Sequence, residues 1–183
     1  FLPFLADFQA GKVRLGHGYQ YFLSQMRPKS RGWLRLRSAD PDQHPEIVFN
    51  YLDDPADAEE MLDGLAQTRE MARQAPWQAM GGTELTPGPD VRNRAEVLSW
   101  MRRIGNTEHH PVGTCRMGHD AMAVTDAEGL VRGLDGLRVV DGAILPLIPT
   151  ANVNAPIIMV AEKIADRIRG RAPMPPEHLV PAR

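Results

Sequence analysis

The segment Trp33-Leu34-Arg35-Leu36-Arg37 alternates apolar and basic side chains. In an extended strand, successive side chains point to opposite faces, so the two leucines share one face and Arg35 and Arg37 the other. This alternation predicts an antiparallel sheet with one face in solvent. Two neighbouring runs rich in β-favouring residues are also predicted to be strands: Tyr19-Gln20-Tyr21-Phe22-Leu23 and Ile47-Val48-Phe49-Asn50-Tyr51.

Two helices are predicted downstream of these strands. Asp53-Asp54-Pro55 supplies an acidic cap and a first-turn proline for the first of them. Residues 94–104 form the second, which ends at Gly105, whereas residues 76–90 are predicted to be loop. The sheet and helices predict an α+β part over residues 1–105. The apolar face of the first helix is expected to contain Ala58, Met61, Leu62, Leu65, Ala72 and Ala75.

The sequence changes character after residue 105. Residues 106–135 are rich in glycine and histidine and lack periodicity, which is typical of loops. Leu137-Arg138-Val139-Val140-Asp141 is predicted to be a short buried strand, and residues 156–169 an amphipathic helix capped by Gly170. We therefore expect a second part over residues 106–170 and a flexible tail over residues 171–183, which contain four prolines.

The predicted strand at residues 137–141 needs neighbouring strands that the rest of the sequence does not obviously supply. The chain also begins without methionine, and its first residues lack the basic start and long apolar core of a signal peptide. We therefore expect the chain to be the inner part of a longer protein, with the missing strands in an N-terminal portion.

Composition excludes several classes of function. Lys and Arg total 21 against 23 for Asp and Glu, a net charge of −2, so no basic excess favours nucleic acid. The longest strongly apolar stretch, residues 157–161, is far shorter than the roughly 20 residues of a membrane span. A single cysteine, Cys115, excludes an intrachain disulfide. The sequence predicts a soluble protein, or a peripheral membrane protein at most.

The first group of candidate functional residues is His109-His110-Pro111-Val112-Gly113-Thr114-Cys115-Arg116-Met117-Gly118. A histidine followed by proline and glycine lies on a stiff, non-helical backbone that another group can approach closely. Such a histidine can act as a base, because histidine is the residue type that exchanges protons most readily near neutral pH. Two alternatives stay open: a solvated or packed loop histidine, and a zinc site. The zinc ligands would be His109, His110, Cys115 and His119.

The second group lies around the predicted strand end and the final helix. A strand that ends in Asp141-Gly142 can present backbone N–H groups, and a helix that begins just after Asn152 and Asn154 offers an amide-rich positive end. Both features suit an anionic or carbonyl-bearing ligand. The alternative is an ordinary strand end followed by an asparagine cap.

In order along the chain, these motifs resemble the C-terminal part of the glucose–methanol–choline (GMC) family of FAD-dependent oxidoreductases. The matching segments are His110-Pro111-x-Gly113-Thr114-Cys115-x-Met117-Gly118, Gly136-Leu137-Arg138-Val139-Val140-Asp141-Gly142, Asn152-x-Asn154 and Ala161-Glu162-Lys163-Ile164-Ala165-Asp166. Upstream segments resemble the substrate domain of the family's choline dehydrogenases. These are Gly16-His17-Gly18-Tyr19-Gln20, Pro28-x-Ser30-Arg31-Gly32 and Asp40-Pro41-x-x-His44-Pro45-x-Ile47-x-Phe49-Asn50-Tyr51. The resemblance spans about residues 16–170.

The resemblance implies an oxidation of a primary alcohol, in which a base removes the hydroxyl proton and FAD accepts a hydride. His110 matches the family's catalytic base, because it directly precedes the Pro-x-Gly-Thr segment. Asn152 matches the second active-site residue, whose amide can donate to the substrate oxygen. Asn154 matches a position near the flavin pyrimidine edge. Asp141 and Gly142 match the strand end that contacts the ribityl and pyrophosphate portion.

The resemblance also implies a fold and partners. Residues 1–105 would be an antiparallel-sheet substrate domain with helices, and residues 106–170 the C-terminal strand, loop and helix of an FAD-binding α/β domain. The Gly-x-Gly-x-x-Gly turn that binds the ADP part of FAD does not occur here, so most of the FAD site is expected in the N-terminal portion. The expected partners are that portion, an alcohol and a peripheral membrane electron acceptor, with a cytoplasmic or inner-face location.

Two alternative functions remain within these expectations. FAD-containing hydroxynitrile lyases of the family use similar motifs without net redox chemistry. A non-catalytic binding or assembly module is the other alternative.

Overall fold

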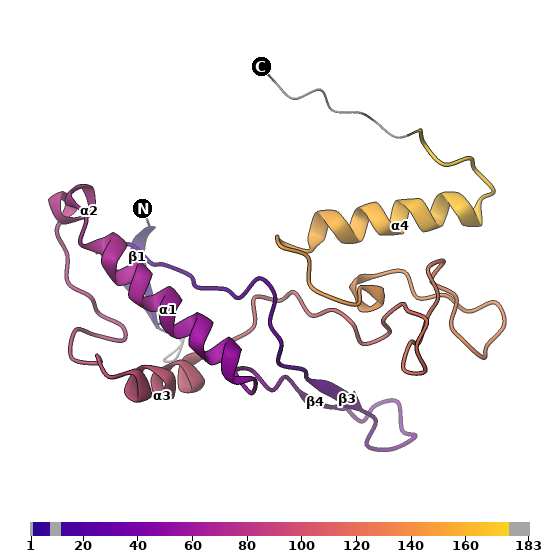
Figure 1. Cartoon of the computed structure of the whole chain (residues 1–183), viewed down its shortest axis with the longest axis horizontal. Helices are drawn as coiled ribbons and strands as arrows, with labels where there is room; N and C mark the ends of the chain where they lie inside the picture. Colours follow the sequence, from indigo (N-terminus) through magenta and orange to yellow (C-terminus); the bar gives the residue numbers. More distant parts are fainter. Residues whose placement is uncertain (1, 8–11, 176–183) are drawn as a thin grey trace. The chain divides into compact units, whose positions relative to one another are not determined.

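The computed structural model describes residues 2–7 and 12–175 (Figure 1). The chain divides into two compact units between Glu108 and His109. Of the predicted tail, residues 171–175 are exposed and belong to no helix or strand, and residues 176–183 lie outside the described part. Among the described residues, no helix is both long and apolar enough to cross a membrane.

The first unit contains two short antiparallel sheets. Strands β1 (Leu2–Asp7) and β2 (Lys12–Gly18) form a hairpin that the sequence analysis did not predict. Pro3 lies within β1, and a proline lowers the strand signal of any sequence run. Strands β3 (Trp33–Arg35) and β4 (Glu46–Val48) form the second sheet.

The sheet of β3 and β4 confirms the predicted antiparallel arrangement but is shorter than expected. Leu34 lies opposite Ile47, so the two side chains share a face, and they are 46% and 52% exposed. The prediction that one face of this sheet is buried is therefore wrong within the described residues, because two strands of three residues offer too little surface for a covering layer.

The predicted strand at residues 19–23 is also wrong. The rings of Tyr19 and Tyr21 instead pack against each other and against Trp77, with ring centroids 5.1–5.5 Å apart. Aromatic residues are common in strands because the face of a sheet offers them a half-buried surface. Here Trp77 of a helix offers such a surface to the two tyrosines instead.

That helix, α2 (Ala75–Met80), lies in the stretch predicted to be loop. Pro76 occupies its first turn, where the missing N–H costs no helical hydrogen bond, and Gly81 ends it with a φ of 68°. The glycines that suggested a loop, Gly81 and Gly82, thus follow a short helix, and residues 81–90 belong to no helix or strand, as predicted.

The longer helices of the first unit confirm the predictions. Helix α1 (Pro55–Ala72) begins after Asp54, whose carboxylate accepts a hydrogen bond from the Ala56 N–H, and α3 (Arg94–Ile104) ends at Gly105. The two helices pack together (Figure 1) through a core of Leu62, Leu65, Val97 and Met101. The predicted apolar face is confirmed for Ala58, Met61, Leu62 and Leu65, whereas Ala75 lies outside α1, at the start of α2, and is exposed.

The second unit consists of loops around α4 (Asn154–Ile168) and the 3₁₀ turn η1 (Gly142–Ile144). The predicted final helix is confirmed, but it begins two residues earlier than expected. Gly170 follows it with a φ of 67°, as a helix-ending glycine does.

The predicted buried strand at residues 137–141 is wrong. Arg138 forms only an isolated antiparallel bridge with Leu130, and Leu137 is 49% exposed. The Val139 N–H donates to the Gly129 carbonyl at 2.9 Å, so this extended segment is paired on one side by a loop. Its apolar residues gave the strand signal, but a single bridge does not make a ladder.

Candidate active site

The loop that carries His110 is attached to the turn η1 by two backbone hydrogen bonds. The Cys115 N–H donates to the Ala143 carbonyl at 3.0 Å, and the Met117 N–H donates to the Ile144 carbonyl at 2.8 Å. Ile144 is completely buried, so this attachment lies in the interior of the second unit.

A second set of hydrogen bonds secures the same loop through Thr125, whose side chain is completely buried. The Thr125 hydroxyl donates to the Cys115 carbonyl at 3.0 Å, and the Gly118 N–H donates to the Thr125 carbonyl at 3.2 Å. The segment from Cys115 to Gly118 is therefore fixed by bonds to two different parts of the unit. Thr125 is not among the residues expected from the sequence, because a threonine in an apolar run carries no distinguishing signal.

Gly142 brings the two candidate groups together. A Cβ at this position would lie 3.0 Å from Ile157 Cδ1, in the first turns of α4, and 3.5 Å from the carbonyl oxygen of Pro111. The backbone of the His110 loop, the turn η1 and the start of α4 therefore meet at a glycine. A larger residue here would press on both neighbours.

Asp141, which precedes this glycine, stabilises the turn η1. Its carboxylate accepts a hydrogen bond of 2.7 Å from the Ala143 N–H and so caps η1. The side chain is exposed, and its second oxygen remains available to accept further hydrogen bonds.

The other candidate side chains lie at the start of α4 and in the loop. Asn152 and Asn154 are exposed, His110 is half-buried, and Val153 gives the helix no side-chain cap. The first N–H groups of a helix lack partners within it and carry its positive dipole end, so hydrogen-bond donors concentrate here. Within the described residues, no hydrogen bond joins His110 to Asn152.

An ion pair that the sequence analysis missed closes the far end of the His110 loop. Both guanidinium nitrogens of Arg116 donate to the Asp120 carboxylate, at 2.7 and 2.6 Å. These bonds, followed by one from the Met122 N–H, hold the pKa of Asp120 well below its usual range. The pKa of Arg116 is raised by the same partner, so both groups stay charged and the pair adds no net charge to the loop.

The zinc alternative gains no support from this geometry. Among the described residues, no three side chains of His, Cys, Asp or Glu come together as metal ligands. Cys115 is half-buried and its backbone, rather than its sulfur, makes the contacts described above.

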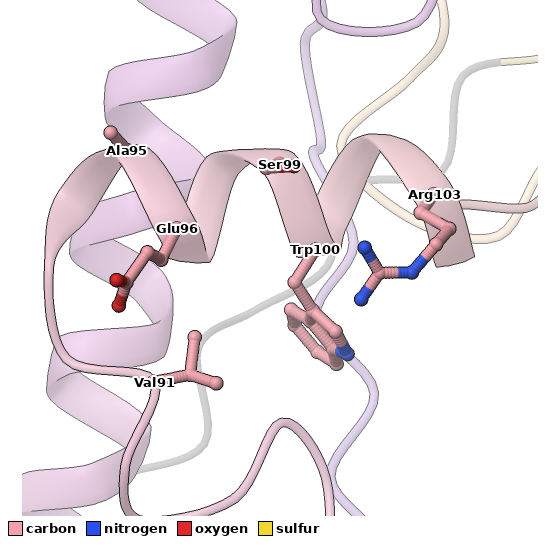
Figure 2. A pocket seen from close by; sticks show the side chains of 6 residues that line it. All are labelled: Val91, Ala95, Glu96, Ser99, Trp100 and Arg103. Atoms are coloured by element: carbon pink, nitrogen blue, oxygen red, sulfur yellow. The ribbon is translucent and has the colours of Figure 1, made fainter.

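The first unit carries an open groove of about 440 Å³ along α3. Figure 2 shows the six residues that line it: Val91, Ala95, Glu96, Ser99, Trp100 and Arg103. It contains none of the candidate residues, which all belong to the second unit.

Comparison with protein families identifies the class of the chain. Residues 28–161 match the family model described as GMC oxidoreductase, so the chain belongs to the GMC oxidoreductase family.

Particular relatives narrow this assignment. The chain is 48% identical over 175 residues to an oxygen-dependent choline dehydrogenase of Chromohalobacter salexigens, with 96% of this chain and 31% of that protein covered. It is 47% identical over 175 residues to an oxygen-dependent choline dehydrogenase of Pseudomonas aeruginosa, with the same coverage. The chain thus spans about a third of the length of these relatives.

Solved structures agree with the family assignment. Pyridoxine 4-oxidase from Mesorbium loti superposes with a TM-score of 0.72 at 30% identity, over 80% of this chain and 29% of that one. An FAD-dependent oxidoreductase from Chaetomium thermophilum superposes with a TM-score of 0.74 at 29% identity, over 79% and 25%. Helices and small antiparallel sheets of the chain therefore match a region of GMC-type enzymes.

Proposed function

We propose that the chain is the C-terminal catalytic part of a flavin-dependent dehydrogenase that oxidises a primary alcohol of the choline type. The observation that carries this proposal is the close approach of the Pro111 carbonyl and the Ile157 side chain to the Cβ position of Gly142. Two parts of the candidate site therefore meet at Gly142. One is the backbone that follows the candidate base His110, and the other is the first part of α4, whose N–H groups can donate hydrogen bonds. Membership of the GMC family and the choline dehydrogenases among its relatives support the reaction and the substrate class.

The candidate base is His110. A neutral imidazole can take the proton of the substrate hydroxyl, and a half-buried position limits competition from water. The amide of Asn152 would donate a hydrogen bond to the same oxygen as it becomes an alkoxide, which stabilises the developing negative charge.

The donors and acceptors present fit FAD. The exposed amide of Asn154 and the uncapped start of α4 suit the carbonyl groups of a flavin ring. Asp141, with one oxygen on the Ala143 N–H, can accept from hydroxyl groups such as those of the ribityl chain. When bound, FAD supplies the acceptor of the hydride that leaves the carbinol carbon.

The remaining partners follow from the same proposal. The ADP part of FAD would be bound by an N-terminal portion of the enzyme, since the chain covers 31% of the length of its relatives. We propose a cytoplasmic or inner-face location, with a membrane-associated electron acceptor as the partner that reoxidises the cofactor.

The test is His110→Ala in the complete flavoenzyme, mixed anaerobically with choline in a stopped-flow instrument. We expect flavin reduction to slow by about 10²- to 10⁴-fold, the usual weight of a general base. His119→Ala is the matched control, because His119 is an exposed histidine of the same loop region, and it should reduce at the unaltered rate. An unchanged rate in His110→Ala contradicts the proposed base. A flavin that stays oxidised in the unmodified enzyme contradicts alcohol oxidation and favours a lyase.

A further inference from the structure

We infer that His109 is a positioning residue for His110, and that it acts through its backbone conformation. This inference rests on the proposed role of His110 as the base. The φ of His109 is 60°, in the left-handed region. Among the described residues, the only other non-glycine residues with positive φ are Asn50 and Leu52, both in the first unit.

The chain on the C-terminal side of His110 has little freedom. Proline fixes its own φ and pushes the preceding residue toward extended conformations, so Pro111 restricts both itself and His110. The carbonyl of Pro111 lies 3.5 Å from the Cβ position of Gly142, and hydrogen bonds from Cys115 and Met117 attach the following residues.

The chain on the N-terminal side comes from α3, which ends at Ile104. Residues 105–108 form no helix or strand, and His109 is the first residue of the second unit. The left-handed turn at His109 therefore lies directly between this incoming segment and the fixed His110-Pro111 pair. If His109 could not adopt that turn, the strain would be shared between residues 105–108 and the His110 backbone, and the share taken by His110 would displace its imidazole.

The chemistry of the amino acids makes this inference testable. Glycine adopts left-handed conformations without cost, and asparagine adopts them routinely. Valine, which is branched at Cβ, is a true outlier there. All three substitutions remove the imidazole of His109, so the series separates the backbone from the side chain.

The experiment compares His109→Gly, His109→Asn and His109→Val in the complete flavoenzyme. The rate constant of flavin reduction is measured per bound flavin at saturating choline, so that unfolded protein does not contribute. We expect the glycine and asparagine variants to stay within about threefold of the unmodified enzyme. The valine variant should slow by about 10- to 100-fold, the usual effect of a small misplacement, while half-saturation by choline changes less.

A second readout does not depend on activity. Amide hydrogen exchange of peptides covering residues 109–117 should increase in the valine variant and stay unchanged in the asparagine variant. If His109→Val does not retain flavin, His109→Ala replaces it and should show an intermediate loss. The same series at His119, where φ is not positive, is the control, and glycine and asparagine should have no advantage over valine there.

The outcomes separate this inference from the proposed function. Equal loss in the three His109 variants would mean that the imidazole itself matters and would overturn the inference. Full activity and unchanged exchange in all three would overturn it as well. Failure of the proposed base appears separately, as an unaltered rate in His110→Ala, and the exchange measurement still tests the backbone turn in that case.

Discussion

At the scale of single residues, Asp57 combines complete burial with a negative charge. Its side chain is 1% exposed, and its two oxygens accept hydrogen bonds from the Lys29 N–H at 2.9 Å and the Ser30 N–H at 2.7 Å. Burial acts to raise the pKa of Asp57, but the hydrogen bonds from Lys29 and Ser30 outweigh it, and the pKa lies below the ordinary 3.8. The carboxylate ties the Pro28-x-Ser30 loop to the first turn of α1.

This lowered pKa predicts a pH dependence of stability. A group whose pKa is lower in the folded state stabilises the protein above its unfolded pKa, and this contribution is lost as pH falls through the folded value. We expect Asp57→Asn to reduce the free energy of unfolding by about 1–3 kcal/mol at pH 7. The difference from the unmodified protein should shrink as pH falls below about 4.

Denaturant unfolding followed between pH 7 and pH 3 measures this difference. Asp53→Asn is the matched control, since Asp53 precedes the same helix and is exposed. A constant difference over the whole pH range would show that the charge of Asp57 is not the stabilising feature.

Gly129 occupies a position where the backbone geometry favours glycine over every other residue. Its φ is 73°, and a Cβ would lie 2.6 Å from the Val139 carbonyl oxygen. We expect Gly129→Ala to lower the free energy of unfolding by about 2 kcal/mol or more, because strain and a backbone clash add.

Gly133→Ala separates these two causes. Gly133 has a φ of 78°, but no atom of the described part of the chain lies within 4 Å of its Cβ position, so only the left-handed strain of about 1 kcal/mol applies. Thermal denaturation of the two variants is the measurement. Equal losses would mean that the contact with Val139 carries no cost.

At the scale of elements, Arg69 attaches the loop before α3 to α1. Its guanidinium pairs with Glu84 at 2.8 Å and donates to the carbonyls of Gly88 and Val91 at 3.2 and 2.9 Å. The side chain is 20% exposed, so these bonds form largely out of solvent. One planar group with several fixed donors serves three acceptors at once.

We expect Arg69→Met to lower the free energy of unfolding by about 2 kcal/mol, because it leaves those acceptors without their donor. Arg69→Lys should recover about half, since an ammonium cannot reach all three. Arg73→Met is the control and should change nothing measurable, because the Arg73 side chain is 70% exposed and its one ion-pair partner among the described residues is Glu70. Faster hydrogen exchange in residues 84–91 would show that the destabilisation lies in the loop that Arg69 holds. If Arg69→Met lost no more free energy of unfolding than Arg73→Met, the prediction would be contradicted.

The elements also show what the sequence could predict. Helices α1 and α3 were predicted because capping residues and apolar spacing are local signals, present in Asp54-Pro55 and before Gly105. Strand pairing is not local. The runs at residues 19–23 and 137–141 have strand composition, yet the first packs on α2 and the second forms a single bridge, because their neighbours in space decided the outcome.

In the candidate site, too, some features could be predicted from the sequence and others depend on contacts between distant residues. The motif order indicated the family, and the family model matches it. The roles of His110, Asn152, Asp141, Gly142 and Asn154 stay predictions, although the meeting point at Gly142 agrees with two groups acting together. Thr125 and the Arg116–Asp120 pair could not be predicted, since their contacts depend on how the loops fold back.

At the scale of the whole molecule, the chain shows apolar surface on its last helix. Ile158, Met159 and Ile168 of α4 are 54%, 59% and 57% exposed, although their unit has a buried interior. The relatives that the chain matches are about three times as long. We expect the chain produced alone to lack flavin absorbance and to bind a dye that reports apolar surface.

Production together with the upstream two thirds of the Chromohalobacter relative should restore flavin absorbance and suppress dye binding. Absorbance at the flavin bands and dye fluorescence are the two measurements. A chain that binds FAD alone would contradict the division of the cofactor site between two portions.

The division of the chain between Glu108 and His109 affects which residues stay together when genes of relatives recombine. His110, Asp141, Gly142, Asn152 and Asn154 all follow that point, so a genetic crossover placed there transmits them as one block. Hybrid genes that exchange only the upstream block among relatives would keep this set together. Such shuffling would pass on the proposed site residues unbroken while the upstream block, the proposed substrate domain, is exchanged.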